Sequence, residues 1–132
     1  MASFSNYNEA YKNPSDIDDE KKKYVFDIDS SESFNEIIKL FPIVVVDAWA
    51  SWCNPCNKIL PKYIELAYSF KQNFDEKQII FLKDNIENDD SIHKKIVNVV
   101  PSFFIYVYGK RFDISGFPTL EENIYDALSI LT

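Results

Sequence analysis

The sequence predicts an α/β domain in which a central mixed sheet of about five strands carries about four helices on its two faces. Two observations predict this class. Strand-like and helix-like segments alternate from residue 24 onward, and the run IVVVDAWA (43–50) suits a central strand that is covered on both faces. Hydrophobic residues make up 46% of the chain, so a packed core is expected.

The beginning of the chain has a different composition. Asn, Ser, Asp and Lys dominate residues 1–23, which include the charge block DIDDEKKK. Such a segment buries little apolar surface, so we expect a flexible or loosely docked extension there. The folded domain is expected over residues 24–132.

The first elements of this domain follow from local patterns. YVFDI (24–28) is typical of a short strand. A helix is predicted to follow and to run to Phe41, because Ser31 or Ser33 can cap it and apolar residues recur at helical spacing. The central strand 43–50 comes next.

The middle of the chain predicts a long helix, a strand and a short helix. The long helix begins at the cysteine pair and runs to about Asn73, and IIFLKD (79–84) is the next strand. A short helix is expected from about Asp89 to Val97. On this helix we expect His93 to lie at the solvated surface, because two lysines follow it.

The C-terminal part predicts a hairpin and a final helix. Strands over 102–108 and 111–115 flank Gly109-Lys110, which suits a tight turn. Thr119 is expected to cap a last helix that extends through Leu131.

Charge and composition argue against several functions. The net charge is −7, whereas nucleic acids and anionic membranes attract basic surfaces. The longest apolar runs are too short to cross a bilayer. His93 is the only histidine and there are two cysteines, so no metal site is expected. Two cysteines also cannot build a disulfide framework.

Both cysteines lie in the segment WASWCNPC (49–56). Cys53 and Cys56 have the spacing of a small reversible disulfide ring at a helix start. The unpaired N–H groups and macrodipole of that helix end would favour a thiolate at Cys53. Pro55 suits the first turn of a helix and would stiffen the ring. The alternative is a pair of buried structural cysteines.

WCNPC (52–56) resembles the WCGPC motif of thioredoxins, and the resemblance extends over about residues 24–132. Asp47 and Trp49 lie in VVDAWA, which is similar to the family's VDFWA strand. Pro61 corresponds to the family's helix-kinking proline, and Lys83 in FLKDNIE to the lysine of its K-x-N-x-D stretch. Later matches are Val100-Pro101-Ser102, similar to the family's cis-proline segment, and the turn and bulge glycines Gly109 and Gly116.

The resemblance implies a catalytic set. Cys53 would attack client disulfides and Cys56 would resolve the mixed disulfide. Asp47 would exchange a proton with Cys56, and Lys83 would tune the charge of Asp47. A structural Asp47–Lys83 ion pair is the alternative, and core packing is the favoured role for Trp49.

The resemblance also implies a substrate groove lined by Trp52, Asn54, Pro55, Val100 and Pro101. The backbone beside Val100 would pair with an extended client strand, across a cis peptide bond before Pro101. An ordinary loop proline is the alternative for Pro101. Asn54 departs from the usual glycine, and residues between the cysteines influence the reduction potential.

Three functions are therefore weighed. The leading one is a monomeric protein disulfide reductase that serves electron transport and redox homeostasis. It has no bound cofactor, and a thioredoxin reductase recharges its redox-active disulfide with NADPH. The second is a disulfide oxidase or isomerase. The third is a redox-active adaptor that docks through residues 1–23 into a larger assembly such as a protein-export machine.

The compartment is predicted on weaker grounds. No signal-like segment opens the chain, so the cytoplasm is expected, with a secretory or vacuolar compartment if a signal peptide has been removed. The abundance of Lys, Asn, Ile, Tyr and Phe resembles proteins from AT-rich genomes such as those of malaria parasites.

Overall fold

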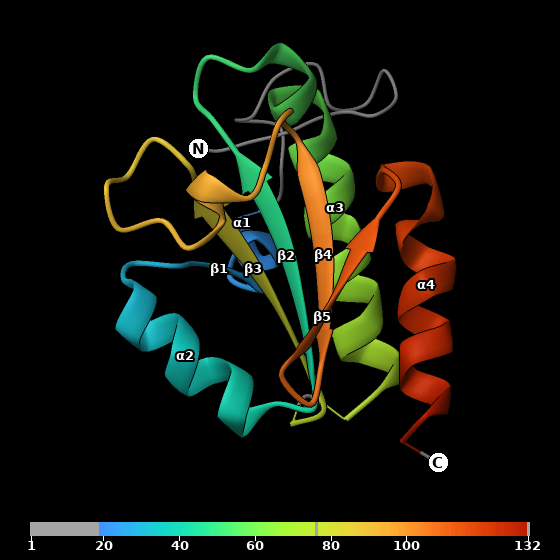
Figure 1. Cartoon of the computed structure of the whole chain (residues 1–132). Coiled ribbons are helices and arrows are strands. Elements are labelled where there is room, and N and C mark those ends of the chain that lie inside the picture. The colour runs from blue at the N-terminus through green and yellow to red at the C-terminus, as the bar shows by residue number, and fades with distance from the viewer. Residues whose placement is uncertain (1–18, 76, 132) are drawn as a thin grey trace.

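The computed structural model describes residues 19–75 and 77–131, which form one five-stranded sheet with helices on both faces (Figure 1). The strand order is β1-β3-β2-β4-β5. The strands are β1 (Val25–Asp27), β2 (Ile43–Trp49), β3 (Ile79–Asn85), β4 (Ser102–Val107) and β5 (Lys110–Ile114). β1, β3 and β2 are parallel, whereas β4 runs antiparallel to β2 and β5 antiparallel to β4. The predicted mixed α/β sheet is confirmed.

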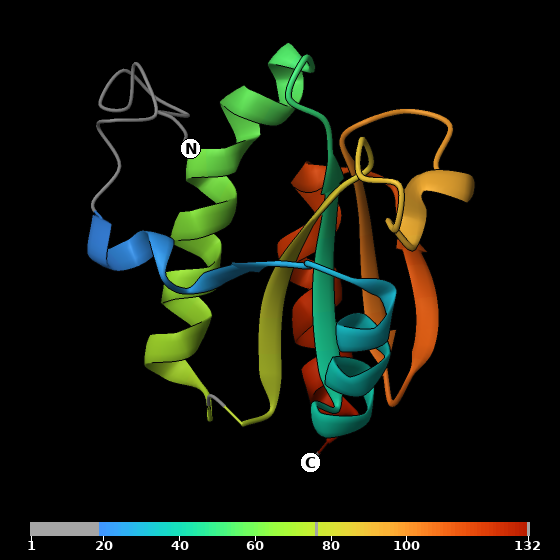
Figure 2. The same cartoon turned by 90° about the vertical axis from the view of Figure 1, so that its left-hand side faces the viewer.

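The helices divide between the two faces because side chains alternate along β2. Ile43 and Val45 point toward α3 (Asn54–Asn73) and α4 (Phe117–Ser129). Val44 and Val46 point toward α2 (Ser31–Leu40). Figure 2 shows α2 and α3 on opposite faces of the sheet. β2 is therefore buried on both sides, which explains its uninterrupted apolar run.

Four predicted boundaries are wrong by a few residues. Ser30, and not Ser31 or Ser33, caps α2, and its side chain accepts the N–H of Ser33. The β4–β5 turn lies at Tyr108-Gly109, both with positive φ. Thr119 lies in the first turn of α4, where its hydroxyl donates to the Gly116 carbonyl, so the helix begins earlier than predicted. It also ends at Ser129 instead of Leu131.

The expected helix over 89–97 is wrong. Its only regular part is one 3-10 turn, His93–Lys95. His93 is fully buried, so the prediction of a solvated surface histidine is wrong as well. The cause is a hydrogen bond of 2.6 Å between the His93 ring and the carboxylate of Asp84 on β3, which draws the histidine inward.

The described end of the predicted extension packs on the domain. A short helix, α1 (Asp19–Lys22), lies beside α3, where Lys21 Nζ is 2.8 Å from Glu65 Oε1. The Lys21 ammonium also lies over the Tyr68 ring. Residues 1–18 of the predicted extension lie outside the described part of the chain.

Candidate active site

A disulfide joins Cys53 and Cys56 at the N-terminus of α3. Cys53 is the N-cap residue, and its Sγ accepts the backbone N–H of Cys56 at 3.1 Å. Pro55 occupies the first turn, where no intrahelical N–H is needed. In the reduced protein, this donor and the helix dipole would stabilise negative charge on Cys53 more than on Cys56.

The segment before β4 forms the opposite wall of the site. The Val100-Pro101 peptide bond is cis, as predicted. The carbonyl oxygen of Val100 lies 3.5 Å from Cys53 Sγ, and Val100 packs against the disulfide cluster. The Val100 backbone and the predicted attacking sulfur therefore face each other.

The outer rim of the site is exposed. Trp52 is 68% exposed, and Asn54 and Pro55 are exposed beside it. Trp49 differs, because it is half-buried and packs against the cysteines, in agreement with the core role favoured for it. Its indole N–H has no hydrogen-bond partner among the described residues.

Asp47 lies on β2 and is 1% exposed, so its expected burial is confirmed. Burial raises the pKa of its carboxyl to about 7, although the positive charge of Lys83 opposes the rise. One carboxyl oxygen has no hydrogen-bond partner within the described chain. Its charge also adds to the effect of burial in raising the pKa of Tyr63 on α3. A carboxyl with a pKa near neutrality is suited to proton exchange.

Lys83 does not form the expected ion pair with Asp47, although the two residues are register partners on β3 and β2. Its ammonium lies 3.5 Å from Asp27 Oδ1 on β1 and over the Trp49 ring. Lys83 therefore acts on Asp47 through its charge and not through a direct ion pair, and the structural alternative for Asp47 stays a prediction. Asp27 competes for Lys83 because β1 and β3 are also in register at these two positions.

Sequence reasoning missed a tie between the cysteine loop and the segment after β3. Glu87 accepts the backbone N–H of Ser51 at 2.7 Å and its hydroxyl at 3.0 Å. These bonds lower the pKa of Glu87. The signal was present in FLKDNIE, where Glu87 follows Lys83 at the spacing of the acidic residue in the K-x-N-x-D stretch.

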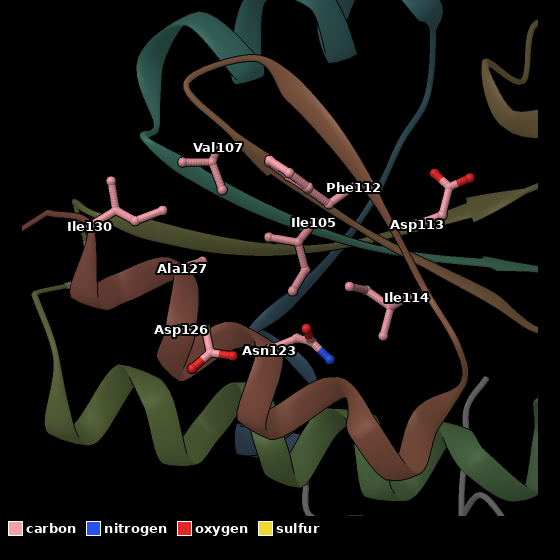
Figure 3. A pocket seen from close by; sticks show the side chains of 9 residues that line it. All are labelled: Ile105, Val107, Phe112, Asp113, Ile114, Asn123, Asp126, Ala127 and Ile130. Atoms are coloured by element: carbon pink, nitrogen blue, oxygen red, sulfur yellow. The ribbon is translucent and has the colours of Figure 1, made fainter.

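Another hollow of the surface does not belong to this site. It lies between β4, β5 and α4 and has a volume of about 230 Å³ (Figure 3). Its lining includes Phe112, Asp113 and Ile130, and none of the predicted site residues. The described residues contain no cluster of His, Cys, Asp and Glu suited to a metal ion. None of the described helices is long and apolar enough to cross a membrane.

Comparison with known proteins gives a consistent match. The family model described as thioredoxin matches residues 25–127. A thioredoxin of Geodia cydonium is 39% identical over 69 residues, which cover 52% of this chain and 59% of that protein. A thioredoxin of Coprinus comatus is 26% identical over 100 residues, covering 74% of this chain and 91% of the relative.

The same match is found among solved structures. The oxidized form of mitochondrial thioredoxin 3 from Saccharomyces cerevisiae superimposes with a TM-score of 0.68 at 25% identity. The superposition covers 80% of this chain and 98% of that structure. The family match over residues 25–127 includes both walls of the site.

Proposed function

This chain belongs to the thioredoxin family of thiol–disulfide oxidoreductases, and we propose that it reduces disulfides in client proteins. The observation that carries the proposal is the Cys53–Cys56 disulfide at the start of α3, facing the carbonyl of Val100. The disulfide supplies the redox chemistry, and the facing backbone supplies a place for an extended client strand.

The proposed reaction has two exchanges. The Cys53 thiolate attacks a client disulfide, forms a mixed disulfide and releases one client thiolate, which takes up a proton. Cys56 then passes its proton to Asp47 and attacks Cys53 Sγ, which closes the Cys53–Cys56 disulfide and releases the second client sulfur as a thiolate, which takes up a proton from solvent. Two electrons pass to the client. The raised pKa of Asp47 supports its role as the proton acceptor.

Insulin reduction tests the proposal directly. The full chain, kept reduced by dithiothreitol, should accelerate the precipitation of insulin chains above the rate with dithiothreitol alone. The Cys53→Ser variant should show only the background rate. Equal rates for the wild type and this variant would overturn the proposal.

The source of electrons is also proposed from the family relationship. A thioredoxin reductase using NADPH would recharge the disulfide, and no bound cofactor would be needed. Oxidation of NADPH in a mixture of the chain, a reductase and insulin would test this. Since such recharging requires a reducing compartment, we place the protein in the cytoplasm. Localisation of the tagged full-length precursor would show whether a secretory compartment is correct instead.

A second function, as an isomerase or oxidase, is favoured by Asn54, which is exposed between the two cysteines. This position contributes to the reduction potential, and a less reducing disulfide would shuffle or form bonds instead of reducing them. Equilibration with glutathione buffers would give the potential. A value close to that of thioredoxin, roughly −270 mV, supports the reductase, and one near −180 mV supports the isomerase.

The adaptor role depends on the N-terminal residues. Its support is the packing of α1 on α3, by which the described end of the extension, from residue 19, is held on one flank of the domain. Insulin assays on the full chain and on residues 19–132 should give the same rate if the extension serves assembly and not catalysis. A solution mass above that of one chain would contradict the proposed monomer.

A further inference from the structure

A buried hydrogen-bond network lies on the α2 face of the sheet, beneath the loop that leads to Val100. His93 and Asp84 are 0% and 1% exposed. The His93 Nδ1 atom lies 2.6 Å from Asp84 Oδ2, and Nε2 lies 2.8 Å from the Tyr106 hydroxyl. An ionised carboxylate only accepts, so Nδ1 donates to Asp84, and a second hydrogen bond joins Nε2 and the Tyr106 hydroxyl.

Asp84 gathers further donors from the same loop. Its Oδ2 also accepts the Ser91 hydroxyl at 2.9 Å and the backbone N–H of His93 at 3.1 Å. Burial would raise the pKa of Asp84, but the hydrogen bonds from His93 and Ser91 outweigh it and lower that pKa. Asp84 is therefore ionised at neutral pH and holds the loop through side-chain and backbone contacts.

Aromatic packing fixes the histidine ring in addition. Phe104 of β4 stacks on it at 4.8 Å between ring centroids, and Phe34 of α2 meets it edge-on at 5.4 Å. Phe34 also packs edge-on against Tyr106. The imidazole is thus held by β3, β4 and α2 together.

A short path leads from this network to the active site. The His93 carbonyl accepts the N–H groups of Ile96 and Val97. The Ser102 hydroxyl donates to the Val99 carbonyl at 2.6 Å, and the next carbonyl, that of Val100, lies 3.5 Å from Cys53 Sγ. Because the 3-10 turn at His93 is the only regular element between β3 and β4, this anchor holds an otherwise irregular loop.

We infer that His93, held between Asp84 and Tyr106, is a positioning residue for client binding, because it fixes the loop that presents the Val100 backbone beside Cys53. The inference rests on the proposed reductase function. A loop already held in its bound shape loses little conformational entropy when a client strand pairs with it. A loosened loop would lose that entropy on binding, so affinity would fall while the chemistry at Cys53 stayed unchanged.

The test uses the full chain with the double substitution Asp84→Leu and His93→Phe. Replacing both partners of a buried hydrogen bond by apolar residues of similar size can leave stability nearly unchanged, and phenylalanine keeps the stacking on Phe104. Tyr106→Phe is a milder variant that removes only one hydroxyl. It provides the same test if the double variant fails to fold. Tyr125→Phe is the matched control, since it removes a hydroxyl from α4.

Two substrates separate positioning from chemistry. Insulin needs a docked strand, whereas the small disulfide dithiobis-nitrobenzoate needs only an accessible thiolate. We expect KM for insulin to rise about threefold to tenfold in the double variant, with kcat unchanged, because the loosened loop must be ordered when the client binds. The rate with the small disulfide should not change. Amide hydrogen exchange at Ile96 and Val97 should become faster, and Tyr125→Phe should match the wild type.

Each other outcome has a definite meaning. An unchanged KM for insulin, despite faster loop exchange, would overturn the inference. Equal losses with both substrates, in step with a lower denaturation midpoint, would assign the network a structural role only and would also overturn it. A wild-type chain that reduces neither substrate would instead contradict the proposed function, independently of His93.

Discussion

At the residue scale, Asp47 shows how burial creates a reactive group. The carboxyl lies on a strand that is apolar elsewhere, it is 1% exposed, and the ammonium of Lys83 is engaged by Asp27. Ionising Asp47 therefore costs free energy, which is why its pKa is about 7. Ionised Asp47 therefore lowers the stability of the fold, whereas its raised pKa suits it to proton transfer near neutral pH.

The first prediction concerns the pH dependence of stability. The folded pKa of Asp47, about 7, lies above the unfolded value of 3.8, so the folded state binds this proton more tightly. Its contribution to the free energy of unfolding is fully present below pH 3.8 and is lost as the pH rises to about 7. At roughly 1.4 kcal/mol per pKa unit, the loss amounts to roughly 4 kcal/mol. We expect the free energy of unfolding of the oxidised Asp47→Asn variant, measured with denaturant across this pH range, not to show that loss.

The variant should therefore be more stable than the wild type at pH 8 and should reduce insulin several-fold more slowly. Subtracting the variant's free energy of unfolding from that of the wild type at each pH cancels the contributions of the other titrating groups. A difference that stays flat with pH would show that Asp47 is not the group that titrates. A normal insulin rate with lowered stability would assign Asp47 a structural role.

The second prediction distinguishes the two cysteines. Cys53 is the helix N-cap and receives the N–H of Cys56, so its thiolate should be the better stabilised one. Iodoacetamide at neutral pH should therefore label Cys53 before Cys56 in the reduced protein, as followed by mass spectrometry. Cys56→Ser should accumulate mixed disulfides with clients, whereas Cys53→Ser should accumulate none. Faster labelling of Cys56 would reverse the assigned roles.

At the element scale, the β4–β5 hairpin depends on two residues with positive φ. Tyr108 has φ 49° and Gly109 has φ 82°, the pattern of a tight turn that matches the twist of the flanking strands. Tyrosine is unusual there, and its backbone N–H is held by the Pro42 carbonyl at 2.8 Å. The hairpin supports β4, whose first residues follow the cis proline of the site.

The third prediction follows from this turn. Gly109→Ala should lower the free energy of unfolding by about 1 kcal/mol, because a Cβ is disfavoured at positive φ. The loss would be conformational, since an added Cβ would meet nothing within 4 Å. Tyr108→Asn should instead raise the free energy of unfolding, because asparagine tolerates a positive φ better than tyrosine does. Urea unfolding of both variants measures these two changes. Equal changes in the free energy of unfolding would contradict the explanation from backbone conformation.

At the scale of the whole molecule, the two faces of the sheet have different tasks. The α3 and α4 face holds the larger core cluster, including Tyr63 of α3, whose pKa the charge of Asp47 helps to raise. The α2 face holds the smaller core cluster and the Asp84–His93–Tyr106 network. Both walls of the site are therefore set by packing, one from each face. The docked helix α1 extends the folded unit to residues before 24 along α3.

The fourth prediction tests the docking of α1. Lys21 and Glu65 are 25% and 23% exposed, so their ion pair is only partly screened by solvent. A double-mutant cycle with Lys21→Met and Glu65→Gln should give a coupling free energy of about 0.5–1 kcal/mol at low salt. The coupling should shrink at about 1 M salt, where the screening length is about 3 Å. A coupling of zero at low salt would show that α1 is not held by this pair in solution.

The sequence by itself determined the class of the fold and the chemistry of the site. Apolar runs and helical spacing are local properties, so they predicted all five strands and the helices α2, α3 and α4 within a few residues. The cysteine pair, Asp47 and Val100-Pro101 were also predictable, because their chemistry depends on short motifs. The ends of elements were less predictable, since several serines near residue 31 could cap α2 equally well.

The tertiary structure decided which charged groups meet. His93 looks like a surface residue in its local sequence, beside two lysines, yet it is buried because Asp84 on β3 and Tyr106 on β4 approach it from distant parts of the chain. Lys83 could pair with Asp47 or Asp27, and the register of β1 with β3 brings Asp27 to 3.5 Å. Buried polar groups require partners, and partners separated by many residues are chosen by packing, which local patterns do not encode.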